Sequence, residues 1–371
     1  MPETQLDPVA LLTEMLRIPS LSGQEAALAR FLAAEMGRLG FTSYVDEAGN
    51  AVGVAGEGPE IVLLGHIDTV PGEVPVRVEG GRLYGRGAVD AKGPFAAFVS
   101  AAARLVARQS EPGGAPLRAR LVLIGAVEEE AATSKGANYV KSRYRPAACI
   151  IGEPSGWDRL TLGYKGRLLV DGRWEQPSAH SAGREPGVAE RAVAFWNAVA
   201  AHCAEHNQGR ARLFDQLLPS LRAIRSGGDG LLEWAELTIG VRLPPGLPPE
   251  ELARTLESLA ERIGGDGPTE HRAASHALRF HDLCPAYQAD KNTPLVRAFL
   301  KGVRAAGGTP GFLLKTGTSD MNVVGPAWGC PILAYGPGDS ALDHTPDEHV
   351  EIAEYLRAID VLQYALEQIC L

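Results

Sequence analysis

The 371-residue sequence predicts an α/β fold into which a second, ferredoxin-like domain is inserted. Several short apolar runs, such as 61–64, end abruptly in charged or histidine residues, as expected of strands that helices cover on both faces. From Gly166 onward the pattern changes to strand, helix, two strands, helix and strand, which is the βαββαβ order of a ferredoxin-like unit. The length of the chain also favours two domains.

Two helices are expected before the first strands. Asp7 and Pro8 supply an N-cap and a first helical position, and an apolar stripe follows them through Met15. The residues 22–25, Ser-Gly-Gln-Glu, have the spacing of a capping box, and apolar residues at helical spacing follow as far as Leu39. Both stripes predict helices that pack on the core of the first domain.

A glycine-rich loop at 85–93 follows the 61–64 strand and precedes a helix of small residues at about 95–108. The loop lacks the third glycine of a dinucleotide fingerprint, because Asp90 occupies that position. The glycines are better explained by a tight loop that projects Asp90. Further buried strands are expected at 117–126 and 147–151.

The remaining elements fall into two groups. In the inserted domain we expect strands and helices over 168–174, 186–205, 221–225, 235–243, 248–263 and 277–281. After it we expect a helix that begins at 292–294, an apolar strand at 330–335 and a final helix at about 351–368. The predicted boundaries are therefore 1–165 and 284–371 for the first domain and 166–283 for the inserted domain.

Composition excludes several classes of protein. A net charge of −9 argues against nucleic-acid or anionic-membrane partners, although a local basic patch would still allow an acidic substrate. Five scattered cysteines without a C-x-x-C pair indicate neither a zinc knuckle nor a disulfide framework, and fit a reducing cytoplasm. The first 16 residues do not resemble a signal peptide, and no run approaches the roughly 18 apolar residues of a membrane span. We therefore expect a cytoplasmic protein.

Polar residues gather where the predicted strands end, or in the loops beside them: His66, Asp68, Asp90, Glu128, Glu129, Glu130, Glu153 and His344. The carboxyl ends of parallel strands face the ligand crevice of an open α/β sheet. Taken alone, His66 is explained equally well as a residue that caps its strand. So many carboxylates in one crevice would repel one another unless cations neutralised them, so the set as a whole predicts a metal site.

The residue types also indicate the chemistry of this site. Two histidines with carboxylates suit zinc, and one shared aspartate can bridge two ions in a hydrolytic centre. Asp68 stands two residues after His66, where it can accept the second ring N–H and fix the tautomer. One glutamate must remain unligated to take a proton from the attacking water.

Six motifs carry a resemblance that extends over essentially the whole chain. They are G-H-I-D-T-V at 65–70, G-R-G-A-V-D-A-K-G at 85–93, E-E-E at 128–130, G-E-P-S at 152–155, S-A-H-S at 178–181 and D-H-T-P-D-E at 343–348. In this order they resemble the two-zinc amidohydrolases that include glutamate carboxypeptidase, acetylornithine deacetylase and succinyl-diaminopimelate desuccinylase. The resemblance implies a three-layer, zinc-peptidase-like catalytic domain and an inserted domain that forms a homodimer.

The resemblance also implies roles for individual residues. It implies two zinc ions per subunit, for which cobalt can substitute, with His66 and Glu153 on one ion, Glu130 and His344 on the other, and Asp90 between them. Glu129 would be the general base and then the acid for the leaving amine. The family usually has Asp-Glu-Glu where this chain has Glu128–Glu130, so a shift of base and ligand by one residue stays open. His180 would serve the oxyanion site of the partner subunit.

Four further stretches, at 128–137, 162–166, 315–322 and 335–339, resemble the hydrolases that release lysine or ornithine from the amino-group carrier protein LysW. In that reaction the amide joins the side chain of the carrier's C-terminal glutamate to the α-amine of the amino acid. Candidate contacts for a substrate carboxylate are Arg242, Lys315, Gly317, Thr318 and Ser319. Asp320 or Asp339 would be suited to the distal ammonium of the released amino acid.

Three other functions are weighed against this one. A sister activity would remove an acetyl or succinyl group from an amino acid, or cleave a dipeptide. A non-catalytic relative would keep the fold as a dimeric binding module, although every expected ligand and the base are present. A serine hydrolase is disfavoured, because residues 152–156 do not form a G-x-S-x-G elbow.

Overall fold

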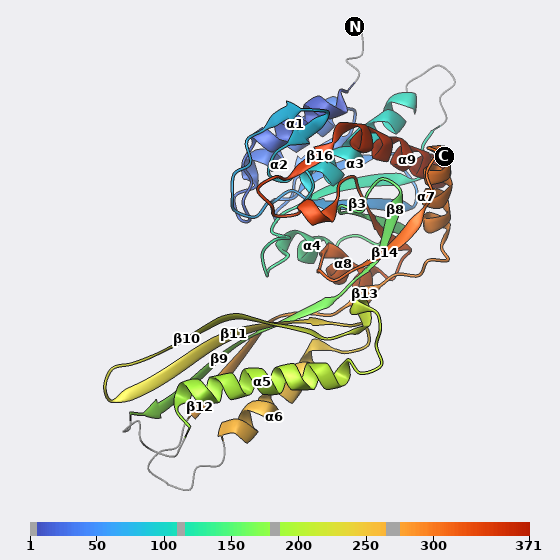
Figure 1. Ribbon diagram of the computed structural model, residues 1–371. Helices are drawn as coiled ribbons and strands as arrows, with labels where there is room; N and C mark the ends of the chain where they lie inside the picture. Colours follow the sequence, from blue (N-terminus) through green and yellow to red (C-terminus); the bar gives the residue numbers. More distant parts are fainter. Residues whose placement is uncertain (1–5, 110–115, 179–185, 265–274) are drawn as a thin grey trace. The chain divides into compact units, whose positions relative to one another are not determined.

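The computed structural model describes residues 6–109, 116–178, 186–264 and 275–371 (Figure 1). The chain divides into two compact units. The first contains the residues up to Gly163, together with Gln288–Leu314 and Ser319–Leu371. The second contains Tyr164–Tyr287 and a short return segment, Lys315–Thr318. The second unit therefore interrupts the first, and each is described by itself below.

A mixed sheet forms the centre of the first unit. Its strands, in the described part of the chain, follow the order β1-β2-β6-β3-β7-β15-β8-β13, and β14 pairs with β8. Their bounds are β1 (Thr42–Val45), β2 (Ala51–Ala55), β3 (Glu60–His66), β6 (Arg120–Ala126), β7 (Ala148–Gly152), β8 (Arg159–Tyr164), β13 (Tyr287–Gln288), β14 (Gly311–Lys315) and β15 (Ile332–Tyr335). Strands β6, β3, β7 and β15 run parallel to one another, so their carboxyl ends share one edge.

Helices cover both faces of this sheet (Figure 1). One face carries α1 (Pro8–Arg17), α2 (Ala26–Arg38), α3 (Lys92–Gln109), α7 (Pro294–Ala305) and α9 (Ile352–Cys370), and the other carries α4 (Lys135–Val140) and α8 (Asp320–Trp328). Ile61 and Leu63 of β3 belong to the core under α3 and α9, while the buried Val62 and Leu64 alternate to the opposite side. The predicted three-layer α/β fold is confirmed.

The Asp7 side chain accepts hydrogen bonds from the backbone N–H groups of Val9 and Ala10 and so caps α1, as predicted. The predicted capping box at 22–25 is wrong. Glu25 occupies the N-cap of α2 without a side-chain cap bond. Its carboxylate accepts from the N–H groups of Gly23 at 2.8 Å and Glu128 at 3.1 Å, while the Ser22 hydroxyl donates to Asp68 at 2.7 Å. The Ser22 hydroxyl and, in part, the Glu25 carboxylate therefore bond residues that are distant in the sequence.

The second unit is an antiparallel sheet of order β10-β11-β9-β12 with two helices on one face. The elements are β9 (Gly166–Pro177), α5 (Val188–His206), β10 (Leu218–Gly228), β11 (Leu232–Leu243), α6 (Pro249–Gly264) and β12 (Ser275–Cys284). This is the predicted βαββαβ order. Buried Trp174 of β9 packs against Phe195 of α5, with ring centroids 5.1 Å apart.

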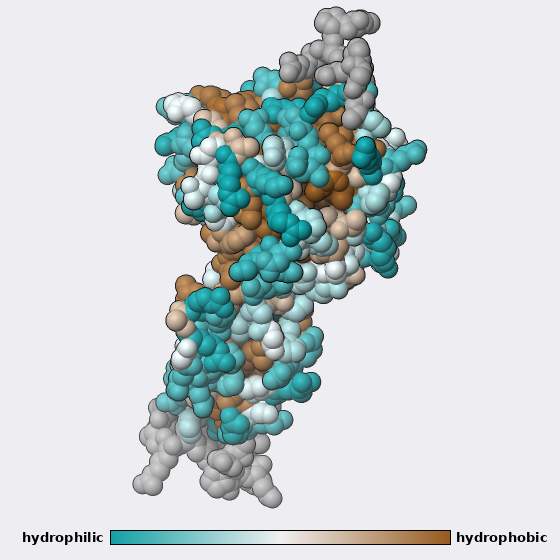
Figure 2. Space-filling model, turned by 90° about the vertical axis from the view of Figure 1, so that its right-hand side faces the viewer, coloured by the Kyte–Doolittle hydropathy of each residue, from teal (hydrophilic) through white to brown (hydrophobic). Residues whose placement is uncertain are grey.

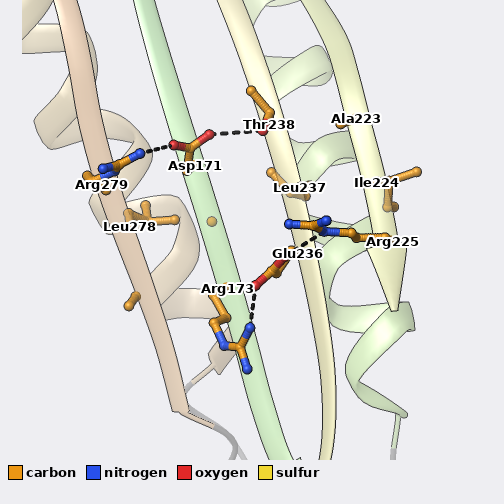
Figure 3. Close-up of a pocket in the computed structure, with 12 residues that line it drawn as sticks. Asp171, Arg173, Ala223, Ile224, Arg225, Glu236, Leu237, Thr238, Leu278 and Arg279 are labelled. Atoms are coloured by element: carbon orange, nitrogen blue, oxygen red, sulfur yellow. Dashed lines mark hydrogen bonds and ion pairs between the residues drawn. The ribbon is translucent and has the colours of Figure 1, made fainter. Parts of the chain in front are cut away.

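The helix-free face of this sheet carries a ladder of charged side chains that lines a shallow pocket (Figure 3). Asp171 accepts hydrogen bonds from Thr238 at 2.9 Å and Arg279 at 2.8 Å. Glu236 accepts from Arg225 at 2.7 Å and pairs with Arg173. Each ion pair joins neighbouring strands, so the ladder stabilises the register of the sheet.

A small three-stranded sheet completes the first unit, with the order β16-β5-β4. Its strands are β4 (Arg77–Glu79), β5 (Arg82–Tyr84) and β16 (His349–Glu351). Figure 2 shows hydrophilic residues over much of the visible surface, with hydrophobic residues in smaller groups between them. Within the described ranges, no helix combines the length and apolarity that crossing a bilayer requires.

Candidate metal centre

The shared edge of the parallel strands delivers most of the predicted site. His66 is the last residue of β3, Glu128–Glu130 follow β6, and Glu153 follows β7. Asp90 comes from the loop between β5 and α3, and His344 from the loop before β16. The first unit thus brings together side chains from five separate segments of the chain.

Asp90 lies at the centre of this cluster. Its Oδ1 atom is 3.0 Å from Nε2 of His66, and its Oδ2 atom is 3.0 Å from Nε2 of His344. The same His344 nitrogen lies 2.8 Å from Oε1 of Glu130. Each oxygen of Asp90 therefore faces a different histidine, which is the arrangement that a bridging carboxylate requires.

The donor set fits a metal. The ligand atoms of His66, Asp90 and Glu130 all lie within 4.8 Å of one another. Imidazole nitrogens and carboxylate oxygens, held close together and largely away from water, are the donors that zinc takes in hydrolytic sites. Glu153, which follows β7 at the same edge of the sheet, is buried, with 7% of its surface exposed.

The charges in the cluster perturb one another strongly. Hydrogen bonds to Asp90 and Glu130 raise the pKa of His344 to about 10. Burial opposes protonation of His66, but hydrogen bonds to Asp68 and Asp90 outweigh it and raise the pKa of that imidazole well above its usual value. Burial likewise disfavours the Asp90 anion, yet hydrogen bonds from His344 and His66 hold the Asp90 pKa far below its ordinary range. These opposite shifts show that the carboxylates of the cluster need positive charge beside them.

Glu129 has a different environment. Its burial raises the pKa of its carboxyl well above the ordinary value. The His66 charge opposes this shift, while the negative charges of Glu153, Asp320 and Glu130 add to it. A half-buried carboxyl with a raised pKa next to metal-type ligands is a candidate for proton transfer.

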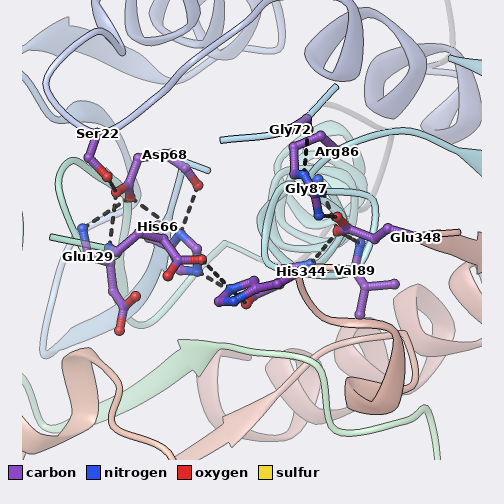
Figure 4. A network of polar contacts seen from close by, with 12 residues as sticks. Ser22, His66, Asp68, Gly72, Arg86, Gly87, Val89, Glu129, His344 and Glu348 are labelled. Atoms are coloured by element: carbon purple, nitrogen blue, oxygen red, sulfur yellow. Dashed lines mark hydrogen bonds and ion pairs between the residues drawn. The ribbon is translucent and has the colours of Figure 1, made fainter. Parts of the chain in front are cut away.

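Asp68 connects strand β3, which ends at His66, to the loop that contains Glu128–Glu130, called the glutamate loop below (Figure 4). Its carboxylate accepts the N–H of Glu129 and the N–H of Glu130, each at 3.0 Å, and the Ser22 hydroxyl at 2.7 Å. The Nδ1 atom of His66 lies 3.1 Å from the main-chain oxygen of Asp68 and 3.4 Å from its carboxylate. Asp68 therefore holds both the imidazole ring and the loop that follows β6.

The side chains of the three consecutive glutamates lie in different environments. Glu128 has a left-handed backbone with φ of 59°, and its carboxylate accepts from the Thr133 hydroxyl at 2.7 Å and pairs with Lys135 at 3.5 Å. Glu130 contacts His344, while Glu129 is half-buried and desolvation raises the pKa of its carboxyl. This separation bears on the register that the sequence left open, because the Glu128 side chain is already committed to Thr133 and Lys135.

The expected substrate contacts divide between the two units. Within the second unit, Arg242 donates from Nη1 to the Thr318 hydroxyl at 3.2 Å, and Lys315 and Gly317 belong to the same return segment. Ser319 belongs to the first unit, where it caps α8 and is buried. Its N–H is bonded to Asn322 at 2.9 Å. His180 lies outside the described residues.

Three residues around the centre are not predicted from the sequence as part of the site: Ser22, Glu25 and Glu348. For Ser22 and Glu25 the sequence predicts a helix cap instead, because the capping-box spacing is satisfied within four residues. Glu348 lies inside the motif at 343–348, four residues after His344, and this proximity was the available signal. The structure shows that each of them contacts a segment that carries a site residue.

A family model described as peptidase family M20/M25/M40 matches residues 62–368. The chain belongs to this family. Among M20 relatives, a protein of Deinococcus radiodurans named [LysW]-lysine hydrolase is 48% identical over 97% of this chain and 96% of its own length. A protein of Thermococcus kodakarensis, named a putative [LysW]-lysine/[LysW]-ornithine hydrolase, is 38% identical over 97% of this chain and 92% of its own.

Solved M20-type structures share the fold of the whole chain. A tripeptidase from Staphylococcus aureus superposes with a TM-score of 0.77 at 17% identity, covering 99% of this chain and 98% of its own. A Bacillus subtilis protein, described as a dinuclear metal binding peptidase of the M20 family, gives a TM-score of 0.71 at 14% identity, with 96% of each chain covered. These similarities confirm the predicted fold class.

Proposed function

We propose that this protein is a cytoplasmic, zinc-dependent amidohydrolase that releases lysine, or ornithine, from the carrier protein LysW. The bond cleaved is the amide between the side chain of the carrier's C-terminal glutamate and the α-amine of the amino acid. The observation that carries this proposal is the near full-length, 48% identity to a relative named for that reaction. The cluster around Asp90 supplies a site able to perform it.

The donor set would hold two divalent ions, zinc or cobalt, through five residues: His66, Asp90, Glu130, Glu153 and His344. Bound there, the ions would polarise the scissile carbonyl and make an attacking water more acidic. Asp90 is placed between the two histidines, one oxygen toward each. In the ligated site the histidines would be neutral, because a metal requires the unprotonated ring nitrogen.

Glu129 is assigned as the base that takes the proton from the water and then delivers it to the leaving α-amine. The raised pKa of its carboxyl supports this role, and so does the engagement of Glu128 with Thr133 and Lys135. Asp68 fixes the position of Glu129 by accepting its N–H. His180 of the partner subunit is assigned to the oxyanion.

Substrate recognition is assigned to the pair Arg242 and Thr318, together with Lys315 and Gly317, for the carboxylate of the amino acid. The N–H of Ser319 already bonds Asn322, so Ser319 is assigned to this carboxylate through its hydroxyl alone. For the distal ammonium, the carboxylate of Asp339 is engaged by the N–H of Ala341 at 2.9 Å. Asp320 is buried and neither oxygen has a hydrogen-bond partner among the described residues, so it is the better candidate.

The homodimer is assigned to the second unit. Strand β10 lies at the edge of its sheet, and Ile224 on it exposes 46% of its surface. A long edge strand with exposed apolar side chains favours pairing with a second copy of the same strand. Light scattering on the wild type and on Ile224→Lys measures this directly, and a monomeric wild type would contradict it.

The substrate is tested by mass spectrometry. Purified protein with zinc or cobalt is incubated with LysW–lysine, LysW–ornithine, acetylornithine, succinyl-diaminopimelate and a dipeptide panel. We expect release from a LysW conjugate at a rate far above the other substrates. The Glu129→Gln variant should keep its zinc and lose at least about 100-fold in kcat. Preferential hydrolysis of a small acylated amino acid or a dipeptide would instead support the sister activity.

A further inference from the structure

Glu348 is completely buried, and its contacts all lie in one loop (Figure 4). Its Oε1 atom accepts the backbone N–H groups of Gly87 at 2.9 Å, Val89 at 3.0 Å and Asp90 at 3.1 Å. Its Oε2 atom accepts from Arg86 Nη1 at 2.7 Å. Four donors from five consecutive residues thus converge on a single carboxylate.

The hydrogen bonds to Glu348 compensate the desolvation of its carboxylate and at the same time fix the loop that donates them. Burying a carboxylate is unfavourable unless hydrogen bonds and an opposite charge compensate it. Here three N–H groups form a concave anion site, of the kind that loops use to hold phosphate, and the chain fills it with its own carboxylate. A second hydrogen bond holds the Arg86 side chain in place, because its Nε donates to the main-chain oxygen of Gly72 at 2.8 Å. The backbone from 86 to 90 is therefore fixed at most of its N–H groups.

The last of these N–H groups belongs to Asp90, the residue between the two histidines. Once the Asp90 N–H is anchored, only the φ, χ1 and χ2 rotations separate it from the carboxylate oxygens. Glu348 thereby limits the positions that those oxygens can occupy. The loop has no regular secondary structure that would do this instead, since α3 begins only at Lys92.

The segment that carries Glu348 also carries His344. His344 contacts the Asp90 side chain, and Glu348 contacts the Asp90 backbone. The main-chain oxygen of Glu348 accepts the N–H of Gly85 at 3.2 Å, where β16 pairs with β5. One short segment therefore supplies a site histidine and sets the position of the bridging aspartate relative to it.

We propose that Glu348, with Arg86, is a positioning residue that sets the metal affinity and ligand geometry of the centre. It acts through the backbone of the Gly87–Asp90 loop and touches neither metal nor substrate. This inference rests on the proposed metal site. It predicts that metal binding, and not only folding, depends on the Glu348 carboxylate.

The test compares zinc affinity, measured by chelator competition on the metal-free dimer or monomer as purified, across four variants. Glu348→Gln keeps one oxygen for the three N–H groups but loses the charge that pairs with Arg86. Zinc affinity should fall about 10-fold in this variant and up to about 100-fold in Glu348→Ala, the range expected for residues that orient metal ligands. Arg86→Gln should give an intermediate loss. The matched control is Glu351→Gln. It removes the exposed 2.6 Å ion pair between Glu351 of β16 and Arg82 of β5, and it leaves the Gly87–Asp90 loop unchanged.

A second readout separates positioning from folding. The visible spectrum of the cobalt-loaded protein reports ligand geometry, and it should change in Glu348→Gln at saturating cobalt while Glu351→Gln matches the wild type. Thermal unfolding of the metal-free proteins measures any structural effect independently. Wild-type zinc affinity and an unchanged cobalt spectrum in Glu348→Gln would overturn the inference. So would a failure of all three Glu348 and Arg86 variants to fold, because the group would then be a folding clamp.

The proposed function and this inference fail in different ways. If the wild type binds no divalent metal, the proposed function is wrong. If the wild type binds metal and Asp90→Asn loses it, while the Glu348 variants match Glu351→Gln, only the positioning role is wrong.

Discussion

Replacing Asp68 by asparagine should disconnect the glutamate loop from strand β3. The Asp68 carboxylate is buried and accepts the N–H groups of Glu129 and Glu130 and the hydroxyl of Ser22. An amide of the same size offers only one oxygen and turns an NH2 group toward one of these donors. The contact between the His66 ring and the main-chain oxygen of Asp68 stays, whereas the 3.4 Å contact of the same ring nitrogen with the Asp68 carboxylate loses its charge.

The size of the effect follows from the contacts that are lost. Leaving one buried N–H without an acceptor costs about 1–3 kcal/mol. If this free energy displaces Glu129 and Glu130 from their positions, it corresponds to roughly a 5- to 150-fold loss in kcat or in metal binding. Ser22→Ala is the control, since it removes one hydroxyl donor and leaves both N–H groups bonded; its effect should be well below that of Asp68→Asn.

Steady-state kinetics on a LysW conjugate, together with zinc content after dialysis, measures this prediction. Circular dichroism checks that the variant is folded. An Asp68→Asn protein with wild-type kcat and zinc content would refute the reasoning. An equal loss in Ser22→Ala would also refute it, because it would show that the hydroxyl and not the two N–H groups sets the position of the loop.

Three further outcomes are expected. Arg242→Gln should raise KM for the conjugate about 10-fold with little change in kcat, since a hydrogen bond to a charged group contributes about 1.5–3 kcal/mol; exposed Arg222→Gln is the control, and an unchanged KM excludes Arg242 from carboxylate recognition. Burial tends to raise the pKa of Asp171, but hydrogen bonds from Arg279 and Thr238 outweigh it and lower that pKa. The stabilisation is therefore present above about pH 4 and lost as the pH falls through the lowered value. Asp171→Asn should then reduce the free energy of unfolding by less than about 1 kcal/mol at pH 7, because the side chain is one-third exposed at 34%, and the difference from wild type should vanish in strong acid. Gly93→Ala would place a Cβ atom 2.2 Å from the main-chain oxygen of Ala88, so denaturant unfolding should show a loss of about 1–3 kcal/mol, and wild-type stability would show that the loop can move aside.

Much of the first unit could be predicted because its signals are local. The run Ile61–Leu64 is apolar on both faces, and the residue types that follow it at His66 and Asp68 are rarely used to fill a core. The same logic located the ends of β6 and β7 and so brought the glutamates to the edge where the structure places them. The βαββαβ order of the second unit could be predicted because each of its strands and helices also has a local sequence pattern.

Other features depend on partners that are distant in the sequence. Ser22 and Glu25 satisfy a helix-cap pattern, yet the Ser22 hydroxyl bonds Asp68, and the Glu25 carboxylate accepts the N–H of Glu128 as well as that of Gly23. Nothing local distinguishes the two outcomes, because the same oxygen and hydroxyl groups serve both. The short strands β4 and β5 and the return segment Lys315–Thr318 were missed because each is too brief to show a hydrophobic period.

The place of β15 in the sheet has a consequence for synthesis of the protein. Strand β15 lies between β7 and β8, although the whole second unit is translated before it, and His344 and Glu348 come later still. A ribosome-bound chain that ends before Ile332 therefore has a gap in its sheet and only part of the Asp90 cluster. We expect a truncated protein that contains only the residues before Ile332 to bind zinc far more weakly than the complete protein. The metal centre would then bind metal only after translation is nearly finished. The rate at which it assembles would depend on the pairing of β15 with β7 and β8, which are distant from it in the sequence.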